Sequence, residues 1–373
     1  MLDPVALTQQ LVRLDTRAGN EKPAAQLLAP LLREAGFTVR IEEGREEPGR
    51  ANLVARTGTG TPITLTGHLD TVPADASGWS FDPLSGDISD DRLLGRGSSD
   101  MKAGVACILA AAIEHSARHA DANVQVVLTF GEETGCDGAA QLDDLAPSPV
   151  VLVAEPTGNQ IVLGHKGALW LRLTAHGRSA HGSRPELGVN ALAALAGAAT
   201  RIHDHDGWPS SETHGAATVN VGTFHAGVQP NLVPDHAELM LDIRTVPGFA
   251  SGDAVSTIRQ LAGPDTDIDA VLDLPSIATD PGDGLVKTLT AALHPTDAAD
   301  AAEATGTDQG PQYATYFTDA SVLTGKLSSP AVILYGPGDP DQAHVTDETC
   351  SVSNITSATE AMLRLLETWR GLA

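Results

Sequence analysis

The sequence is poor in aromatic residues, basic residues and cysteine. Phe, Trp and Tyr make up 3% of the 373 residues, and 23 Lys and Arg stand against 48 Asp and Glu, for a formal net charge of −25. Nucleic-acid binding needs clustered cations for the phosphates and commonly uses aromatic rings for the bases, so this composition argues against a nucleic-acid partner. Cys107, Cys136 and Cys350 are too widely spaced for a disulfide framework or a CxxC metal site, and we expect buried free thiols.

Long apolar runs are also absent. No window reaches the roughly 18 uninterrupted apolar residues that a membrane-spanning helix needs. The N-terminal segment MLDPVALTQQLVRLDTRAG lacks the basic and then apolar regions of a secretion signal. We therefore expect a soluble, cytoplasmic protein with no membrane partner. A chain of 373 residues also exceeds the size at which a single core stops growing, which predicts two domains.

Short strands alternate with helices in the first and last parts of the chain. This alternation predicts an α/β domain with a mostly parallel central sheet flanked by helices, in which ligands bind at the carboxyl ends of the strands. The spacing of apolar residues predicts helices over residues 2–15, 21–36, 101–117, 282–293 and from about 347. Strand-like runs fall at residues 38–42, 51–56, 62–67, 124–130, 150–154 and 331–338.

A different pattern occupies residues 166–275. The predicted elements there follow the order strand, helix, strand, strand, helix, strand. This βαββαβ order is that of the ferredoxin-like α+β unit, which about 110 residues can form as a separate domain. We therefore predict a discontinuous first domain of residues 1–165 and 276–373, with residues 166–275 inserted into it as a second domain.

Polar side chains gather where the predicted strands of the first domain end. Seven of them lie at strand-to-loop transitions flanked by Gly or Pro: His68, Asp70, Asp100, Glu132, Glu133, Glu155 and His344. Taken singly, Asp100 would be read as a helix cap and the two adjacent glutamates as a solvated turn. Independent caps and turns need not share one kind of position, so the joint pattern favours a site. Two imidazoles with several carboxylates suit a pair of zinc-like ions bridged by one carboxylate.

The motifs that carry these residues occur in a recognisable order. GHLDTVP, GRGSSDMKAG, FGEETG, AEPTG, GRSAHGSRPELGVNA, LDIR and AHVTDE resemble the metal-dependent amidohydrolase and peptidase family that includes acetylornithine deacetylase, succinyl-diaminopimelate desuccinylase, aminoacylase and the glutamate carboxypeptidases. The resemblance extends over nearly the whole chain. It implies that the discontinuous domain is catalytic and that the inserted domain serves dimerisation and acts as a lid that contributes substrate contacts.

The resemblance also implies roles for the clustered residues. It gives five metal ligands: His68 and Glu155 for one ion, Glu133 and His344 for the other, and Asp100 bridging both. It makes Glu132 the general base and later acid, and Asp70 the residue that orients His68. Because adjacent side chains of a strand face opposite ways, Glu133 can bind an ion while Glu132 addresses a water. The implied cofactors are two divalent ions, with zinc the default and cobalt or manganese suited to the same ligands.

Three residues of the inserted domain are candidates for substrate contact. His181 in RSAHGSRP matches a histidine thought to stabilise the oxyanion, often across a dimer interface. Arg244 in LDIRTV could bind a substrate carboxylate through its planar fork, and Asn231 is a further pocket candidate. Without the resemblance, His181 would be read as a surface residue and Arg244 as part of a solvated strand face. The other histidines look like surface or helix-end residues without a role, among them His115, His119, His203, His205 and His214.

The function implied is hydrolysis of the amide bond of N-acyl amino acids by a metal-activated water in a homodimeric enzyme. The segment GTDQGPQYATYFTDASVL, residues 306–323, favours this deacylase interpretation. It resembles the corresponding region of the acetylornithine deacetylase-like branch and lacks the Gly-Thr-Ser pattern associated with the desuccinylase. A dipeptidase or carboxypeptidase of the same family is the alternative, because the same water attacks either amide. A non-catalytic dimeric binding protein is a third reading, disfavoured because no expected ligand or base is missing.

Overall fold

The computed structural model describes residues 2–45, 47–294, 312–328 and 331–372 of the chain. Of the segment that favours the deacylase interpretation, residues 306–311 therefore lie outside the described part. No helix in the described residues has the length and hydrophobicity needed to cross a membrane. The three cysteines are free and buried, which confirms that expectation.

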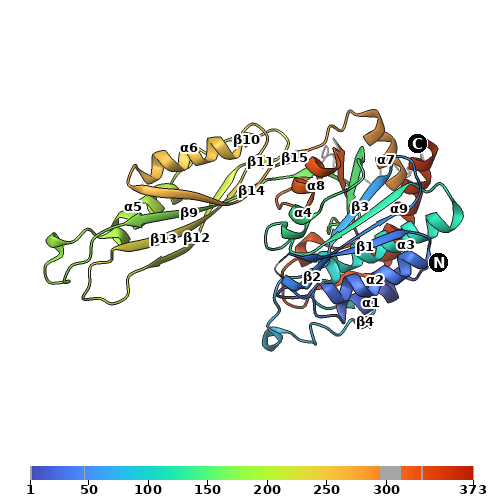
Figure 1. The fold of residues 1–373 in the computed structure, drawn as a ribbon, viewed down its shortest axis with the longest axis horizontal. Helices are drawn as coiled ribbons and strands as arrows, with labels where there is room; N and C mark the ends of the chain where they lie inside the picture. The colour runs from blue at the N-terminus through green and yellow to red at the C-terminus, as the bar shows by residue number, and fades with distance from the viewer. Residues whose placement is uncertain (1, 46, 295–311, 329–330, 373) are drawn as a thin grey trace. The chain divides into compact units, whose positions relative to one another are not determined.

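The chain forms two compact units. Unit 1 comprises residues 1–164, 279–312 and 318–373, and unit 2 comprises residues 165–278 and 313–317. Unit 2 is therefore inserted into the sequence of unit 1, and five residues further along the chain join it. The ribbon in Figure 1 shows the elements of both units by label.

A central sheet forms the middle layer of unit 1. Its strands follow the order β1-β2-β6-β3-β7-β17-β8. The four middle strands, β6, β3, β7 and β17, are parallel, whereas β1, β2 and β8 pair antiparallel at the sides. The middle strands are buried along their whole length, as expected for a parallel sheet covered on both faces. The bounds are β1 Thr38–Gly44, β2 Glu47–Arg56, β3 Ile63–His68, β6 Val124–Thr129, β7 Val150–Val153, β8 Val162–His165 and β17 Ala331–Leu334.

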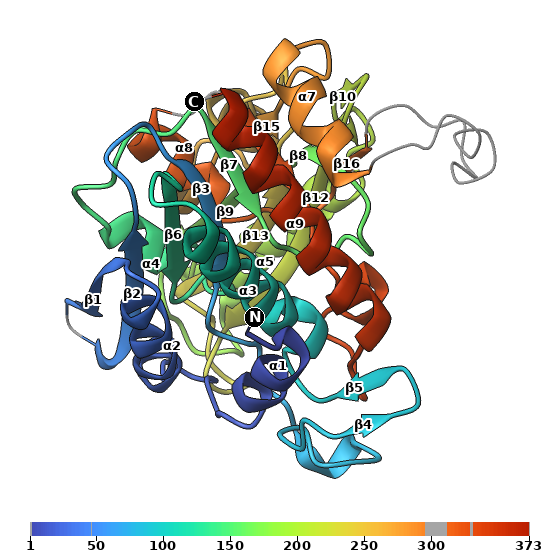
Figure 2. The same ribbon diagram turned by 90° about the vertical axis from the view of Figure 1, so that its right-hand side faces the viewer.

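Helices cover the two faces of this sheet. On one side α1, α3, α7 and α9 pack beside one another, with α3 against α9, and on the other α4 packs with α8 (Figures 1 and 2). Helix α1 begins where the Asp3 side chain accepts hydrogen bonds from two amides of the first turn. The bounds are α1 Pro4–Val12, α2 Lys22–Glu34, α3 Ala103–Arg118, α4 Asp137–Gln141, α7 Gly284–Leu293, α8 Ala320–Leu327 and α9 Val352–Leu372.

A small three-stranded sheet lies before α9 in the chain. Strand β18 (Thr349–Ser351) pairs with β5 (Arg92–Leu94), which pairs with β4 (Ile88–Ser89). The last helix consequently begins at Val352, and the expectation that it begins near residue 347 was wrong, because the intervening residues pair as a strand. Short helical turns complete unit 1: Ala76–Gly78, Ser98–Lys102 and Pro340–Gln342.

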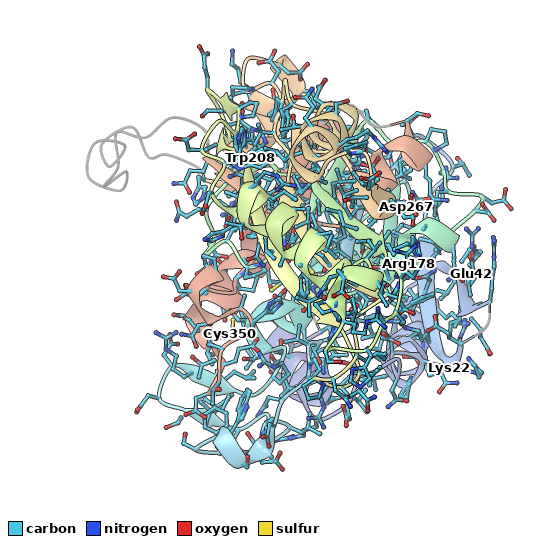
Figure 3. All side chains as sticks on the ribbon, turned by 90° about the vertical axis from the view of Figure 1, so that its left-hand side faces the viewer. Lys22, Glu42, Arg178, Trp208, Asp267 and Cys350 are labelled. Atoms are coloured by element: carbon cyan, nitrogen blue, oxygen red, sulfur yellow. The ribbon has the colours of Figure 1, made fainter. Side chains whose placement is uncertain are left out.

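Unit 2 has the βαββαβ order. Its antiparallel sheet follows the order β12-β13-β9-β14, and α5 and α6 pack on one face of it. Alternate residues of β9 and β13 are buried, so one face of the sheet forms the core and the other is solvated. Trp208, which Figure 3 labels, packs against this core, and its ring centroid is 6.3 Å from that of the core residue Phe249. The bounds are β9 Ala168–His176, α5 Ala191–His203, β12 Thr218–Ala226, β13 His236–Arg244, α6 Ser251–Ala262 and β14 Thr266–Leu274.

Four two- or three-residue strands and a turn complete the description: β10 Ser210–Ser211, β11 Gly215–Ala216, β15 Ile277–Ala278, β16 Gln312–Ala314 and the turn Pro185–Leu187. The largely parallel central sheet flanked by helices and the ferredoxin-like strand order together confirm the predicted fold class.

Candidate active site

Three neighbouring parallel strands bring polar residues to one edge of the unit 1 sheet. Strand β3 ends at His68, the Glu132–Glu133 pair follows β6, and Glu155 follows β7. Strands β6, β3 and β7 are adjacent and run the same way, so their carboxyl ends lie together. This is the edge at which ligands of open α/β sheets bind, and all four side chains belong to it.

Asp100 lies between two imidazoles. Its Oδ1 is 3.2 Å from Nε2 of His68, and its Oδ2 is 3.4 Å from Nε2 of His344. The side chain does not cap the following helix, because α3 has no side-chain cap. One oxygen toward each histidine is the arrangement that a carboxylate shared by two ions requires.

Glu133 completes the contact with His344. Its Oε2 is 2.8 Å from Nε2 of His344, whereas its Oε1 is buried and has no hydrogen-bond partner among the described residues. One ligand atom each from His68, Asp100 and Glu133 lie within 4.8 Å of one another. A buried carboxylate oxygen without a partner is costly unless a cation or donor satisfies it, so this set suits a metal ion.

The two adjacent glutamates lie in a turn and not on a strand. Strand β6 ends at Thr129, and Gly131 adopts a positive φ of 66°. The turn is not solvated, since Glu132 is 6% exposed. Strand alternation therefore does not place the pair. The Asp70 carboxylate does, because its two oxygens accept the amide hydrogens of Glu132 and Glu133 at 3.2 and 3.1 Å.

Asp70 also faces the ring of His68. The Nδ1 atom of His68 is 3.0 Å from the backbone oxygen of Asp70 and 3.5 Å from Oδ1 of its carboxylate. These contacts occupy Nδ1 and turn Nε2 toward Asp100. A ligating histidine commonly has such a partner on its other nitrogen, which fixes the ring and its tautomer.

Sequence reasoning missed Glu348, although it ends the AHVTDE motif. Its carboxylate is fully buried and accepts hydrogen bonds from the amides of Gly97, Ser99 and Asp100 at 2.8–3.0 Å. It also pairs with Arg96 at 2.6 Å. Glu348 thus holds the backbone of the turn that presents Asp100. The signal was present in the sequence as an acidic residue four positions after His344, but nothing local connects it with a turn about 250 residues away.

The electrostatics of the cluster favour cations. Burial, together with neighbouring carboxylates, raises the pKa of Glu133, and it raises the pKa of Glu132 and Glu155 well above the ordinary value. Hydrogen bonds to Asp100 and Glu133 raise the pKa of His344 to about 10. The cluster therefore binds protons avidly, and divalent ions would compete with those protons for the same atoms. The residues present fit such ions.

The candidate residues of unit 2 lie at two ends of its sheet. His181 bridges to Leu232 beside Asn231, and its Nδ1 accepts a hydrogen bond from the amide of Ser183 at 3.1 Å. Both His181 and Asn231 are exposed. Arg244 ends β13, and its guanidinium pairs with Asp242 at 3.0 Å.

Strand β13 separates the two groups. Asn231 lies before the first residue of β13, and Arg244 is the last residue of this strand. The nine residues of β13 span roughly 26 Å. The structure of a single chain therefore brings His181 and Asn231 together and leaves Arg244 apart from them.

Two histidines that looked like surface residues are buried. His115 is fully buried on α3, and His214 is 6% exposed, with its Nε2 2.9 Å from the backbone oxygen of Ile277. His115 lies in the last turn of α3, which the interpretation as a surface or helix-end residue allows, although it is buried; for His214 that interpretation was wrong, because the packing of other segments over it cannot be read from the local sequence.

Comparisons with known proteins show which family this chain resembles. The model of peptidase family M20/M25/M40 matches residues 64–368. A protein of Staphylococcus epidermidis described as a probable succinyl-diaminopimelate desuccinylase is 29% identical over 392 residues, which cover 93% of this chain and 92% of that protein. A probable carboxypeptidase of Aspergillus flavus is 35% identical over 263 residues, and the match spans 64% of this chain and 61% of that protein.

A solved structure supports the fold. The M20 family metallo-carboxypeptidase of Sulfolobus solfataricus superposes with a TM-score of 0.74 at 19% identity, covering 99% of each chain. At that identity the likeness concerns the fold alone.

Proposed function

Because this chain belongs to peptidase family M20/M25/M40 and is a metal-dependent hydrolase, we propose that it removes the acyl group of N-acyl amino acids by attack of water on the amide. The observation that carries the proposal is the position of Asp100, with one carboxylate oxygen toward His68 and the other toward His344. A carboxylate placed in this way supports a site for two ions.

Five residues would hold the ions in this proposal: His68 and Glu155 one ion, His344 and Glu133 the other, and Asp100 both. When bound, two divalent ions would polarise the amide carbonyl and make an attacking water more acidic. Zinc is our choice because imidazole and carboxylate ligands suit it, and cobalt and manganese fit the same set.

Glu132 is the proposed general base. Its backbone amide donates a hydrogen bond to the Asp70 carboxylate. The charges of His68, Glu155 and Glu133 act on its own carboxyl group. It would accept a proton from the attacking water and then deliver it to the departing amine. Burial raises its pKa well above that of an exposed glutamate, which suits a carboxyl that must both accept and donate.

We further propose that unit 1 is the catalytic domain and that unit 2 supplies substrate contacts and a dimer interface. His181 would donate to the oxyanion, and Asn231 and Arg244 would contact the substrate. In the free chain the Arg244 guanidinium pairs with the Asp242 carboxylate. To bind a substrate carboxylate, Arg244 would therefore have to release Asp242.

Exposed apolar side chains support homodimer formation through unit 2. Leu187, Val189, Leu192 and Val228 are 37–86% exposed, and they lie in the loops near His181 or at the start of α5. Val228→Asp should therefore weaken a dimer measured by sedimentation, whereas a monomeric wild type would contradict the dimer. We also propose a cytoplasmic location, with which the three free thiols are compatible.

A peptidase is the second candidate. The relative from A. flavus is described as a carboxypeptidase, and the same cluster of residues could hydrolyse a peptide bond next to a free carboxylate. A desuccinylase is favoured by the description of the S. epidermidis relative. All three activities release an amine from an amide.

Amine release from a panel separates these activities. N-acetyl amino acids, N-succinyl amino acids and dipeptides would be supplied to protein loaded with zinc or cobalt, with Glu132→Gln as the blank. Cleavage of acyl amino acids alone is the result we expect. Preferential cleavage of dipeptides would move the enzyme to the peptidase candidate, and no cleavage in any metal-loaded sample would contradict the proposed deacylase.

A further inference from the structure

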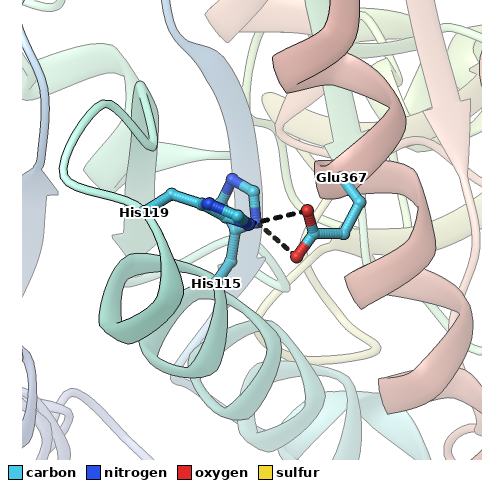
Figure 4. Close-up of side chains that lie close together, drawn as sticks. All are labelled: His115, His119 and Glu367. Atoms are coloured by element: carbon cyan, nitrogen blue, oxygen red, sulfur yellow. Dashed lines mark hydrogen bonds and ion pairs between the residues drawn. The ribbon is translucent and has the colours of Figure 1, made fainter.

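A second group of metal-ligating side chains lies at the other end of α3 from the candidate active site. His115 and His119 are at the carboxyl end of α3, and Glu367 is on α9 (Figure 4). The active-site residue Asp100 precedes the amino end of α3. The helix rises roughly 18 Å between its first residue and His115, so the two groups are separate.

The three side chains converge on a small volume. Nε2 of His119 is 2.8 Å from Oε2 of Glu367, and Nδ1 of His115 is 3.3 Å from Oε1 of the same carboxylate. The two imidazole centroids are 4.9 Å apart. One ligand atom from each residue lies within 4.8 Å of the others.

These separations suit a single small ion. Tetrahedral zinc with ligands at about 2.0–2.2 Å places neighbouring ligand atoms roughly 3.4 Å apart. Each imidazole faces one oxygen of Glu367, at 2.8 Å from His119 and 3.3 Å from His115, and the three ligand atoms lie within 4.8 Å of one another, so modest adjustment of the side chains would accommodate one ion.

The burial of the His115 ring is a second, independent indication of a ligand. The His115 side chain is fully buried, and neither ring nitrogen makes a hydrogen bond of ordinary geometry with a described residue; its polar neighbours are the Glu367 carboxylate, 3.3 Å from Nδ1, and the backbone of Ala122. Oε1 of Glu367 is buried without a hydrogen-bond partner too. A histidine that served only as packing would ordinarily satisfy one nitrogen, since an unsatisfied buried polar group is costly. A metal ion bound by Nδ1 of His115 and by the Glu367 carboxylate would satisfy one ring nitrogen and the carboxylate oxygen at once.

We propose that His115, His119 and Glu367 form an accessory site for a zinc-class transition-metal ion, distinct from the candidate active site. Two imidazoles and one carboxylate are the ligands that such ions prefer, and a water can fill the fourth position. Burial lowers the pKa of His115, so its imidazole is neutral and offers a lone pair at neutral pH.

The nearby charge on Arg118 does not block the site. Its guanidinium donates to Glu114 at 2.8 and 2.9 Å and stays 3.8 Å from Oε1 of Glu367. The Arg118 side chain is 44% exposed, so water screens its charge.

An ion at this position would fasten two parallel helices at their carboxyl ends. Near the other ends, the Cys107 thiol lies 3.4 Å from the backbone oxygen of Ile355. The pairs Cys107 with Ile355 and His115 with Glu367 show that α3 and α9 run side by side in the same direction. Binding to the folded chain alone would therefore raise the unfolding temperature.

Zinc content measured by difference tests this proposal. Wild type, Glu367→Gln and His119→Gln would be stripped with a chelator, dialysed against one free zinc concentration and analysed for bound zinc and for the zinc-induced rise in unfolding temperature. Glu360→Gln, an exposed position on the same helix, and His203→Gln, an exposed histidine of α5, are the matched controls.

We expect each site variant to bind one zinc per chain fewer than wild type and to lose part of the thermal shift, while both controls match wild type. The difference does not depend on how many ions the active site takes. Equal zinc content and equal shifts in wild type and His119→Gln would overturn the proposal. His119 is partly exposed, so this variant decides the matter even if Glu367→Gln does not fold.

Discussion

The two units hold their candidate functional side chains in different ways. In unit 1, His68 and Glu132 are 1% and 6% exposed. The Asp70 carboxylate holds both residues, because it contacts the ring of His68 and accepts a hydrogen bond from the backbone amide of Glu132. In unit 2, His181 and Asn231 are exposed. Unit 1 thus contains a group of side chains that the fold itself buries and arranges, whereas the candidate residues His181 and Asn231 of unit 2 are open to solvent.

The difference has a physical cause. Buried carboxylates must be held by hydrogen bonds or ions, since their desolvation is otherwise too costly, and this need rigidifies the unit 1 cluster. Exposed polar residues on loops carry no such requirement. Variants of the proposed ligands and their supports in unit 1 should therefore alter metal content, whereas variants of the candidate residues in unit 2 should alter kinetics with the metal retained.

The largest effect should come from Asp100→Ala. It removes the carboxylate that faces both histidines, so zinc affinity should fall by more than about 100-fold, beyond the 10–100-fold typical when an outer partner of a ligand is lost. Activity should fall with it. Dialysis with metal analysis and amine release measure the two, with Asp265→Asn at an exposed position of unit 2 as the control. Retained zinc would show that Asp100 is not a shared ligand.

His181→Ala should lower kcat by about 100-fold, the usual loss for one oxyanion donor. Zinc content should not change, because His181 belongs to unit 2, whereas all the proposed metal ligands belong to unit 1. Steady-state kinetics beside metal analysis test this, with His203→Ala for comparison. A normal kcat would remove His181 from the mechanism, and a loss of zinc would contradict the division of roles.

Glu348→Gln should lower zinc affinity by about 10–100-fold, as expected when a residue behind a ligand is changed. The amide replaces a carboxylate that pairs with Arg96 and accepts three backbone amides of the turn that carries Asp100. Competition with a zinc-binding dye would measure the change, and Glu360→Gln serves as the control. An unchanged affinity would mean that the turn keeps its shape without Glu348.

Arg244→Lys should have the smallest effect. Lysine keeps the charge but loses the planar fork, so we expect KM to rise by less than about tenfold with kcat and zinc unchanged. The ion pair with Asp242 is partly exposed, so the free energy of unfolding should change by less than about 1 kcal/mol. A large fall in kcat would give Arg244 a part in the chemistry that its place at the far end of β13 does not suggest.

Much of the fold could be predicted from local pattern. Apolar runs such as residues 124–129 and 150–153 are buried parallel strands, and the βαββαβ order of unit 2 follows from its alternating strands and helical spacing. The small sheet before α9 could not be predicted in the same way. Its strands β5 and β18 lie about 250 residues apart in the sequence, and each is only three residues long.

The candidate site shows the same division. His68, the Glu132–Glu133 pair and Glu155 end or follow buried strands, whereas Asp100 and His344 lie in turns; the residues were recognisable by their metal-ligand chemistry, but the contacts that support them were not. Asp70 accepts two amides from a turn about 60 residues away, and Glu348 supports a turn about 250 residues away. Such long-range hydrogen bonds depend on the assembled fold. The burial of His115 was missed for the same reason, since α9 covers it from the far end of the chain.

The adjacent pair Glu132 and Glu133 offers the most direct test of the account. Zinc content and turnover would be measured for Glu132→Gln and Glu133→Gln under identical loading. We predict that Glu132→Gln keeps the wild-type zinc content and loses about 100-fold or more in kcat, whereas Glu133→Gln loses zinc. Equal zinc loss in both variants, or wild-type turnover in Glu132→Gln, would contradict the assignment of a base and a ligand to neighbouring residues.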